Sequence, residues 1–293
     1  MKIIITIPAY NEEKTIGHAI ENIKDAMKGT GYNYKILVYD DGSKDETAET
    51  AKKKGAIVYS HKRNKGLAET FRDELKACLK EGADVIVHID ADMQYDEKKI
   101  PLMIRKIEEG YDLVLGSRFR GKIKGMPFMK RFGNVLFSKT ISWLTDINIT
   151  DSTTGFRAFT RDVAEEIEII NTFTYTQEQI IRTAKHKFRI TEIPVDTRET
   201  RASRLFSSPF NYAAKAWINI FRIYRDFEPL KFFGSIGFTF FLLGFILGLY
   251  IIYTWVTKGD VVALPRVMLS ILLVMIGVQI ILFGFLADMM KKQ

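Results

Sequence analysis

The residues best suited to chemistry in this chain form a short acidic motif directly after an apolar run. Asp90 and Asp92 stand two positions apart, and Gln94 follows at the same spacing. The run at 85–89 is rich in β-branched residues and predicts a buried strand, so both carboxylates would project from one side of an extended chain. Such oxygens suit Mg²⁺ or Mn²⁺, with substrate phosphates completing the shell. The motif therefore predicts a metal-bound diphosphate, although an acidic pair that simply starts a polar turn is a common alternative.

The elements that must position this motif follow from an alternation of apolar patterns along the first 117 residues. Strands are predicted at 2–7, 34–40, 56–60, 84–89 and 112–116, and helices at 13–28, 44–54, 65–81 and 97–109. This alternation predicts an α/β fold with an open, mostly parallel sheet flanked by helices. Ligands in such folds bind beyond the carboxyl ends of the strands. Four of those ends carry polar clusters, at 8–12, 40–43, 90–92 and 116–118.

The next stretch is basic. Seven cations and no acid occur between Arg118 and Thr145, namely Arg118, Arg120, Lys122, Lys124, Lys130, Arg131 and Lys139. Any one of them could belong to a solvated face, but the group as a whole predicts an anionic ligand. A second α/β portion follows, with a turn at 151–155, strands at 156–160 and 189–195, and a helix at 175–186.

The C-terminal part predicts membrane insertion. The segments 232–257 and 267–287 carry no charge, and each is long enough to cross a bilayer as a helix. Before them, apolar residues recur at helical spacing, which predicts an amphipathic interfacial helix: Phe206, Phe210, Ala214, Trp217, Phe221 and Tyr224. The predicted organisation is a catalytic domain at 1–205, an interfacial helix at 206–230, and a two-helix transmembrane hairpin at 231–293 with spans near 232–256 and 267–287.

Charge and cysteine content narrow the remaining possibilities. The net charge of +8 fits an anionic lipid surface or lipid substrate, and no nucleic-acid-binding signature accompanies it. Cations flank the two spans on their outer sides, so the positive-inside rule predicts an integral membrane protein whose catalytic domain faces the cytoplasm. The single cysteine, Cys78, excludes an internal disulfide.

Six motifs in chain order resemble the GT-A glycosyltransferases of family 2. They are 7–12 (IPAYNE), 40–43 (DDGS), 64–66 (NKG), 90–94 (DADMQ), 116–118 (GSR) and 154–157 (TGFR). With the two terminal spans, the chain is similar to the dolichyl-phosphate mannose synthase and polyprenyl-phosphate glucosyltransferase branch. The resemblance covers residues 1 to about 226. It implies a Rossmann-like GT-A fold.

The resemblance also implies roles for individual residues. The nucleotide sugar would be bound by Pro8, Tyr10, Glu12, Asp40, Asp41, Lys65, Gly66, Asp90 and Ala91. A divalent metal, Mg²⁺ or Mn²⁺, would be held by Asp90, Asp92 and Gln94. The sugar or acceptor side would involve Glu178, and the acceptor phosphate would be bound by Arg118, Arg131, Arg198 and Arg201. The 198–204 loop lacks a glycine that the family often has, which leaves open whether Arg198, Arg201 or Arg204 contacts the phosphate.

The chemistry of the acceptor supports this interpretation. A phosphate monoester has a second pKa near 6 and is already a nucleophile at neutral pH, so it needs positioning by arginines rather than a general base. The expected function is inverting transfer of mannose or glucose from GDP-mannose or UDP-glucose to dolichyl or polyprenyl phosphate. The alternatives are a glycosyltransferase with a glycan acceptor and a non-catalytic nucleotide-sugar-binding membrane protein. Membrane lipid is an expected partner, and the oligomeric state is left open.

Overall fold

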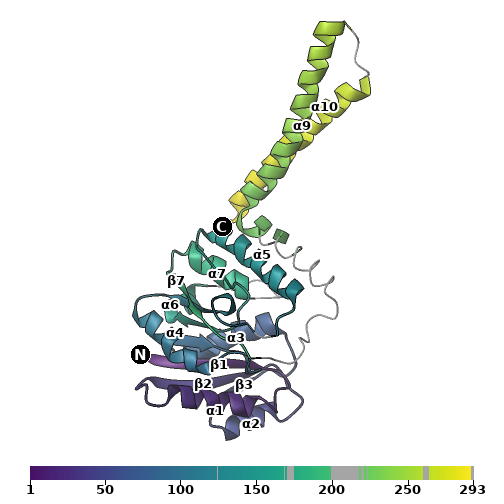
Figure 1. Cartoon of the computed structure of the whole chain (residues 1–293). Coiled ribbons are helices and arrows are strands. Elements are labelled where there is room, and N and C mark those ends of the chain that lie inside the picture. The colour runs from purple at the N-terminus through teal and green to yellow at the C-terminus, as the bar shows by residue number, and fades with distance from the viewer. Residues whose placement is uncertain are drawn as a thin grey trace. The chain divides into compact units, whose positions relative to one another are not determined.

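The computed structural model describes residues 1–123, 125–167, 169, 175–198, 218, 221–222, 224–259 and 264–291. The chain divides into two compact units, Met1–Ala213 and Ala214–Gln293. The first is built around one sheet, and the second contains two long apolar helices (Figure 1).

Seven strands form the sheet of the first unit, in the order β3-β2-β1-β4-β6-β5-β7. Their bounds are β1 Lys2–Ala9, β2 Asn33–Asp40, β3 Ile57–Ser60, β4 Val85–His88, β5 Leu113–Ser117, β6 Arg157–Thr160 and β7 Ile190–Pro194. Only β6 runs antiparallel to its neighbours, β4 and β5, among the described strands. The remaining neighbours are parallel, which confirms the predicted mostly parallel sheet.

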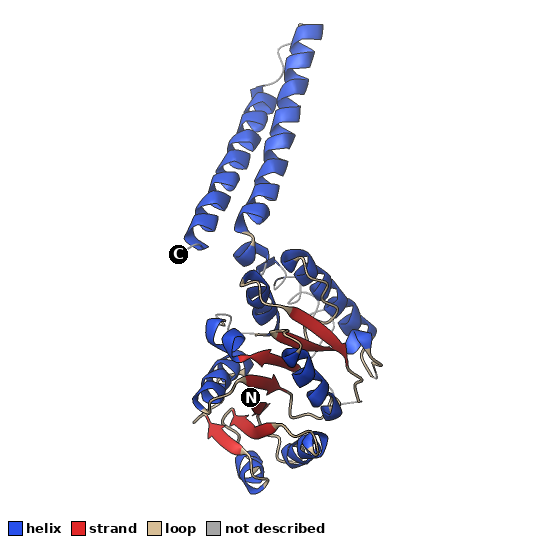
Figure 2. Ribbon diagram, turned by 90° about the vertical axis from the view of Figure 1, so that its left-hand side faces the viewer, coloured by secondary structure: helices blue, strands red, loops and turns tan. Residues whose placement is uncertain are grey.

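Helices cover both faces of this sheet (Figure 2). The α-helices are α1 Ile16–Met27, α2 Thr47–Lys53, α3 Leu67–Lys80, α4 Ile100–Glu108, α5 Phe128–Thr145, α6 Arg161–Glu166 and α7 Thr176–Lys185. Two 3₁₀ helices, η1 Glu97–Lys99 and η2 Arg118–Arg120, follow the metal motif and β5. The order of strands and helices over the first 117 residues is the one that the sequence predicts.

Alternation along the strands distributes apolar side chains to both faces. Ile3, Ile5 and Ile7 of β1 are fully buried and join a core with α1 and α4. On the opposite face of the sheet, Phe71 of α3 stacks on Tyr175 with ring centroids 3.8 Å apart. Each fully buried isoleucine contributes roughly 1.5–3 kcal/mol to folding. Both faces therefore anchor the strand ends that carry the polar motifs.

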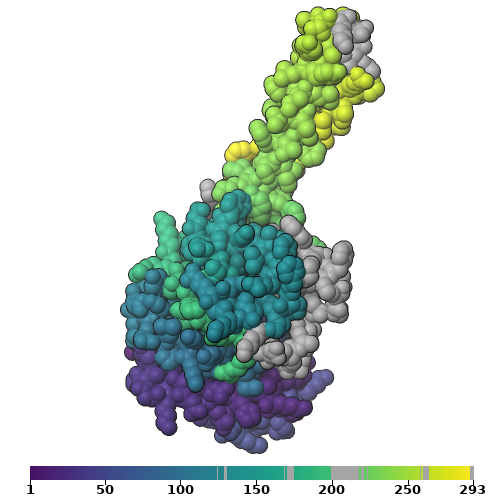
Figure 3. All heavy atoms as spheres, in the orientation of Figure 1, coloured from purple at the N-terminus to yellow at the C-terminus, as the bar shows by residue number. Residues whose placement is uncertain are grey.

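The cation-rich stretch contains an 18-residue helix, α5, that the sequence analysis did not predict. Its buried side includes Asn134 and Ser138, which interrupt the apolar periodicity that marks an amphipathic helix. Its outer side exposes three aromatic residues: Phe128, Phe132 and Trp143. Figure 3 shows this part of the chain, in teal, at the surface of the first unit.

The second unit contains α9 Pro229–Lys258 and α10 Leu264–Lys291, which pack as an antiparallel pair. Both are long and apolar enough to cross a membrane, and the predicted spans lie inside them. A Cβ atom on Gly277 would lie 2.5 Å from the backbone nitrogen of Phe241, so the helices meet at glycine. Ser270 Oγ donates a hydrogen bond to the carbonyl oxygen of Gly244 at 2.8 Å. This close packing confirms the predicted hairpin.

The predicted interfacial helix at 206–230 falls mostly outside the described residues. Phe206, Phe210, Ala214 and Trp217 are among those that the structure does not describe. The described residues between 218 and 227 are helical. Both Ile218 and Phe221 are more than half exposed.

Candidate functional site

The polar motifs meet at the carboxyl ends of β1, β2 and β4, as the parallel topology requires. β1 and β2 end in register, with Ala9 opposite Asp40. The loop after β1 is tied to the loop after β2, because Asn11 N–H donates to Ser43 Oγ at 2.9 Å and Glu12 N–H donates to Thr47 Oγ1 at 2.8 Å. Asn11 has a φ of 53°, a left-handed conformation that Asn tolerates better than most residues.

The predicted nucleotide residues around this junction differ in accessibility. Tyr10 is exposed, Pro8 is half-buried, and Glu12 is buried. Asp40 is also buried, and its Oδ1 accepts a hydrogen bond from Ser43 N–H at 3.1 Å. Tyr10 is therefore the side chain of this group most open to a ligand.

Asp41, which is predicted to bind the nucleotide sugar, has hydrogen-bond partners within the protein. Its Oδ1 accepts hydrogen bonds from the backbone N–H of Lys65 at 2.8 Å, and its Oδ2 accepts one from Gly66 N–H at 2.9 Å. His61 Nδ1 lies 2.8 Å from the same Oδ1. Both oxygens of Asp41 thus hold the turn that precedes α3, and a direct contact with the nucleotide stays a prediction.

The loop after β3 approaches the loop after β2 closely at Gly42. Gly42 has a φ of +71°, and a Cβ atom there would lie 2.6 Å from the carbonyl carbon of Arg63. A larger residue at 42 would push the two loops apart. Lys65 and Gly66, both predicted to bind the nucleotide sugar, are brought to the same edge as Asp40 by this contact.

The predicted metal loop follows β4 directly. Asp90, Asp92 and Gln94 are half-buried, and Ala91 is buried. Asp92 Oδ1 accepts a hydrogen bond from Gln94 N–H at 3.0 Å, and Met93 between them has a φ of +57°. A bulky residue in this left-handed conformation is unusual and marks a constrained loop.

The Asp90 carboxylate rests against the backbone of Gly155. A Cβ atom on Gly155 would lie 2.5 Å from Asp90 Oδ2, so only glycine leaves room for the carboxylate. Gly155 N–H donates to the hydroxyl of Tyr95 at 3.3 Å. The metal loop and the 150–155 turn therefore pack as one unit.

The donor set fits a hard divalent cation. Within the described residues, no three His, Cys, Asp or Glu side chains converge on a common point. Two carboxylates and an amide oxygen are nevertheless the protein share expected for Mg²⁺ or Mn²⁺, which takes the rest of its shell from water and phosphate. Asp90, Asp92 and Gln94 would therefore hold the metal only together with a diphosphate.

Arg118 lies in a buried ion pair. Its Nε donates to Asp151 Oδ2 at 2.7 Å, and its Nη2 donates to Asp151 Oδ1 at 2.9 Å and to Thr153 Oγ1 at 2.7 Å. Burial disfavours the charged guanidinium, but Tyr95, Asp151 and Asp90 raise the pKa of Arg118 above its usual value. Arg118 therefore holds the 150–155 turn in place. Because Arg118 is buried, its contact with an acceptor phosphate stays a prediction.

The other predicted acceptor residues are dispersed over three elements. Arg131 is exposed on α5. Glu178 on α7 is buried and accepts a hydrogen bond from Arg182 Nε at 2.9 Å. The side chain of Arg198 is 50% exposed and donates to Glu97 Oε2 at 3.1 Å. Arg201 and Arg204 lie outside the described residues.

The segment after β7 touches the metal loop. Arg198 N–H donates to the carbonyl oxygen of Gln94 at 3.0 Å, and Thr197 forms a β-bridge with Tyr95. This contact brings the start of the predicted phosphate-binding loop to the metal motif. Pairing between residues about a hundred positions apart has no local sequence signal.

A buried polar network behind the metal loop also has no counterpart in the sequence analysis. His88 of β4 is fully buried, with Nδ1 2.7 Å from Glu74 Oε1 and Nε2 2.7 Å from the hydroxyl of Tyr175. Arg157 of β6 pairs with His88 across the sheet and places its guanidinium over the Tyr175 ring. The only sequence signal for this network is the presence of His88 and Arg157 inside apolar strands.

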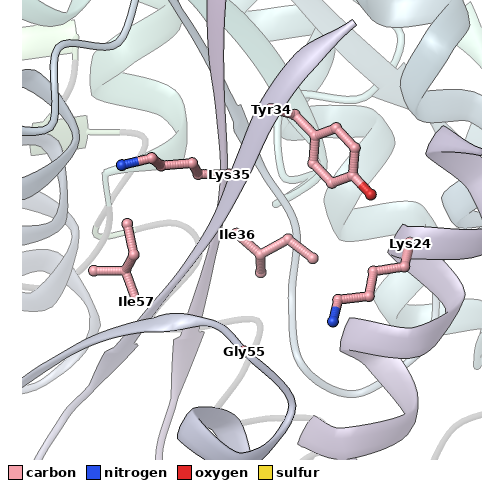
Figure 4. Close-up of a pocket in the computed structure, with 6 residues that line it drawn as sticks. All are labelled: Lys24, Tyr34, Lys35, Ile36, Gly55 and Ile57. Carbon is pink, nitrogen blue, oxygen red and sulfur yellow. The ribbon is translucent and has the colours of Figure 1, made fainter. Parts of the chain in front are cut away.

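A cavity of about 340 Å³ lies elsewhere (Figure 4). It is lined by Lys24, Tyr34, Lys35, Ile36, Gly55 and Ile57. Because these residues belong to α1 and to the starts of β2 and β3, the cavity is at the opposite edge of the sheet from the motifs. It therefore does not belong to the candidate active site.

Comparison with known proteins finds two family models that match this chain. The family model described as glycosyl transferase family 2 matches residues 4–168, and the model described as GtrB C-terminal hairpin matches residues 228–292. The first of these covers the strand ends and both loops that carry the acidic motifs.

Two curated archaeal proteins are similar over most of their length. A dolichyl-phosphate hexose transferase of Haloferax volcanii is 32% identical over 70% of this chain and 86% of its own. A UDP-N-acetylglucosamine–dolichyl-phosphate N-acetylglucosaminyltransferase of Methanococcus voltae is 32% identical over 69% and 87%. Among solved structures, glucosyl-3-phosphoglycerate synthase from Mycobacterium tuberculosis has a TM-score of 0.60 at 21% identity, covering 76% of this chain and 79% of that one, and shares the fold.

Proposed function

Because this chain belongs to glycosyl transferase family 2, we propose that it transfers a hexose from a nucleotide sugar to a polyprenyl phosphate, with inversion at the anomeric carbon. The observation that carries this proposal is the contact between the metal loop and the segment after β7. The backbone bond between Arg198 and Gln94 joins a site suited to a diphosphate to the start of a loop rich in arginine.

The donor side is supported by the loops after β1, β2 and β4. Tyr10 is exposed beside the junction of the first two loops, and Asp90 and Asp92 lie at the end of the neighbouring strand β4. A divalent metal held by Asp90, Asp92 and Gln94 would neutralise the charge that develops on the leaving diphosphate. Asp92 thus acts as a ligand and not as a general base.

The acceptor side is supported by charge and by the relatives. Two curated relatives carry dolichyl phosphate in their names, and this chain matches a GtrB C-terminal hairpin. Arg131 and Arg198 are exposed residues of the unit that carries the metal loop. Arginine binds phosphate oxygens in a bidentate manner and keeps its charge at all physiological pH values.

The proposed reaction needs no deprotonation of the nucleophile. An oxygen of the lipid phosphate attacks the anomeric carbon from the face opposite the leaving group, and the bond from that carbon to the nucleotide diphosphate breaks. The arginines position the phosphate and reduce its repulsion from the departing diphosphate. The cations that flank α9 and α10 support a cytoplasmic location of the catalytic unit, by the positive-inside rule.

A direct assay tests the proposal. Purified full-length protein with polyprenyl phosphate, Mn²⁺ and a radiolabelled nucleotide sugar is expected to give a chloroform-soluble labelled product. GDP-mannose, UDP-glucose and UDP-N-acetylglucosamine should be assayed in parallel, because the sequence does not determine the sugar. Transfer only to a water-soluble glycan would show that the acceptor is a glycan and not a lipid phosphate. Binding of nucleotide sugar without transfer to any acceptor would instead indicate a non-catalytic role.

A further inference from the structure

His61, directly after β3, lies between two carboxylates from different elements. Its Nδ1 is 2.8 Å from Asp41 Oδ1 at the end of β2, and its Nε2 is 3.0 Å from Asp73 Oδ2 on α3. The imidazole side chain is only 5% exposed. The ring also meets the ring of Tyr39 edge-on, with centroids 4.9 Å apart. These contacts fix both the position and the orientation of the ring.

The two carboxylates hold the imidazole through its two different ring nitrogens. Burial favours the neutral form of Asp73, but hydrogen bonds from His61, Lys76 and Lys65 outweigh burial and lower the pKa of Asp73 to about 2. Asp73 is therefore ionised at neutral pH.

The polar groups around His61 come from three parts of the chain. Tyr39 lies in β2 and Asp41 directly follows it, Asp73 and Lys76 lie on α3, and Lys65 lies in the loop before α3. Lys65 Nζ shares Asp73 Oδ2 with the imidazole ring, at 3.2 Å.

The contacts of His61 connect two turns at the candidate nucleotide site. Asp41 accepts hydrogen bonds from Lys65 and Gly66, and the backbone N–H of His61 donates to the carbonyl oxygen of Asp40 at 2.9 Å. Asp73 anchors the other side of the ring to α3. Loss of the imidazole ring would leave two carboxylates facing each other across the space that the ring occupies.

We propose that His61 is a positioning residue of the nucleotide-sugar site that holds the 64–66 turn against the 40–43 turn. This inference rests on the proposed function, because it assumes that the nucleotide binds at these turns. His61 itself contacts neither the sugar nor the reacting atoms in this arrangement. Its removal should weaken nucleotide binding and leave the chemical step nearly unchanged.

The test compares His61→Phe with wild-type protein, both as the full chain. Calorimetric titration with UDP and GDP in Mn²⁺ should show a dissociation constant raised roughly ten- to a hundredfold, the effect expected for lost hydrogen bonds to charged groups. The KM for the nucleotide sugar should rise in parallel, with kcat changed less than about threefold. The KM for polyprenyl phosphate should not change.

Asp73→Asn is the second variant, and it decides the case if His61→Phe does not fold. It removes the carboxylate that holds Nε2 of the ring, so it should weaken nucleotide binding, though less than His61→Phe does.

The matched control is His186→Phe. His186 is an exposed imidazole whose Nδ1 lies 3.2 Å from Glu166 Oε2, far from these turns in the sequence, and its replacement should leave nucleotide affinity unchanged. Equal affinity of His61→Phe and wild type would overturn the inference alone. Failure of the wild-type protein to bind either nucleotide would instead contradict the proposed function.

Discussion

Two arginines of the same basic stretch occupy opposite environments. Arg118 is buried and paired with Asp151 through its Nε and Nη2 atoms, while Arg131 is exposed on α5. A buried guanidinium depends on its partner carboxylate, because removing one member of such a pair leaves an uncompensated charge. Mutations that affect these two arginines are therefore expected to differ in their effect on stability.

Asp151→Asn should lower the free energy of unfolding by about 3–5 kcal/mol, because Arg118 would keep its buried charge without a carboxylate. Thermal unfolding of the purified protein in detergent measures this loss. Arg131→Gln is the contrasting variant, since it should leave stability unchanged and raise the KM for polyprenyl phosphate. Similar stability of both variants would contradict the bracing role of Arg118.

Asp92 carries a prediction about turnover. Asp92→Ala removes one of two carboxylates proposed to hold the metal, so kcat should fall by about a hundredfold or more, in line with the loss of a main transition-state stabiliser. Folding should persist, because Asp92 is half-buried in a loop. Steady-state assays measure the fall in kcat, and a circular dichroism spectrum equal to that of the wild type shows that the variant is folded. Unchanged turnover would remove Asp92 from the mechanism.

The sequence identifies these motif residues but not all of their partners. Asp90 and Asp92 are recognisable because two carboxylates directly follow an apolar strand. The partners of Asp41 lie 20 to 25 residues away in His61, Lys65 and Gly66, and Asp151 lies 33 residues from Arg118. Such pairs are formed by the packing of loops, so no periodicity or spacing indicates them.

At the level of elements, the 150–155 turn supports the metal loop. Gly155 leaves room for the Asp90 carboxylate, and the turn is held in place by the pair of Arg118 and Asp151. Thr150 and Asp151 also donate their backbone N–H groups to Glu192 Oε1 of β7, at 2.9 and 3.0 Å. Arg118 of η2 and Glu192 of β7 thus hold the 150–155 turn, which supports one side of the proposed metal site.

Gly155→Ala should therefore impair the use of metal. The added methyl group would displace Asp90, so the Mn²⁺ concentration for half-maximal activity should rise about tenfold, equivalent to about 1.4 kcal/mol. Gly17→Ala is the control, because the nearest atom to its Cβ would be Thr50 Cγ2 at an ordinary 3.4 Å. An unchanged metal requirement in Gly155→Ala would indicate that Asp90 is not held by this turn.

The elements themselves were predictable where one pattern dominates. The strands at 2–7 and 34–40 correspond to β1 and β2 because each has an apolar run bounded by polar residues. Helix α5 was missed because Asn134 and Ser138 occupy its buried side, where Ser138 Oγ donates to Ser152 Oγ at 3.2 Å. The reversed direction of β6 depends on pairing with β4 and β5, which a single strand pattern does not encode.

At the level of the whole molecule, the chain combines an α/β catalytic unit with an apolar hairpin. The hairpin helices pack through glycine, so their separation is set by residues without side chains. Gly277 and Gly244 allow the close approach, and Ser270 adds one interhelical hydrogen bond. The stability of this anchor is therefore sensitive to volume at a few positions.

Gly277→Val should destabilise the hairpin by about 1–3 kcal/mol, the usual cost of overpacking a tight contact. Its Cβ atom would lie 2.5 Å from the backbone of Phe241, which cannot move without bending α9. Gly234→Val is the matched control, since its Cβ atom would have no neighbour within 4 Å. Thermal unfolding in lipid nanodiscs distinguishes the two, and equal stability would contradict glycine-mediated packing.

The antiparallel strand β6 has a topological consequence. Because β5 and β6 are adjacent in the sheet, with Leu115 opposite Arg157, the segment between them leaves and re-enters the sheet at neighbouring points. That segment contains the basic stretch, α5 and the Arg118–Asp151 pair, while the proposed donor-side loops after β1, β2 and β4 all precede it. The basic stretch is therefore one closed excursion of the chain, and it does not interrupt the order of the strands that carry the proposed donor site.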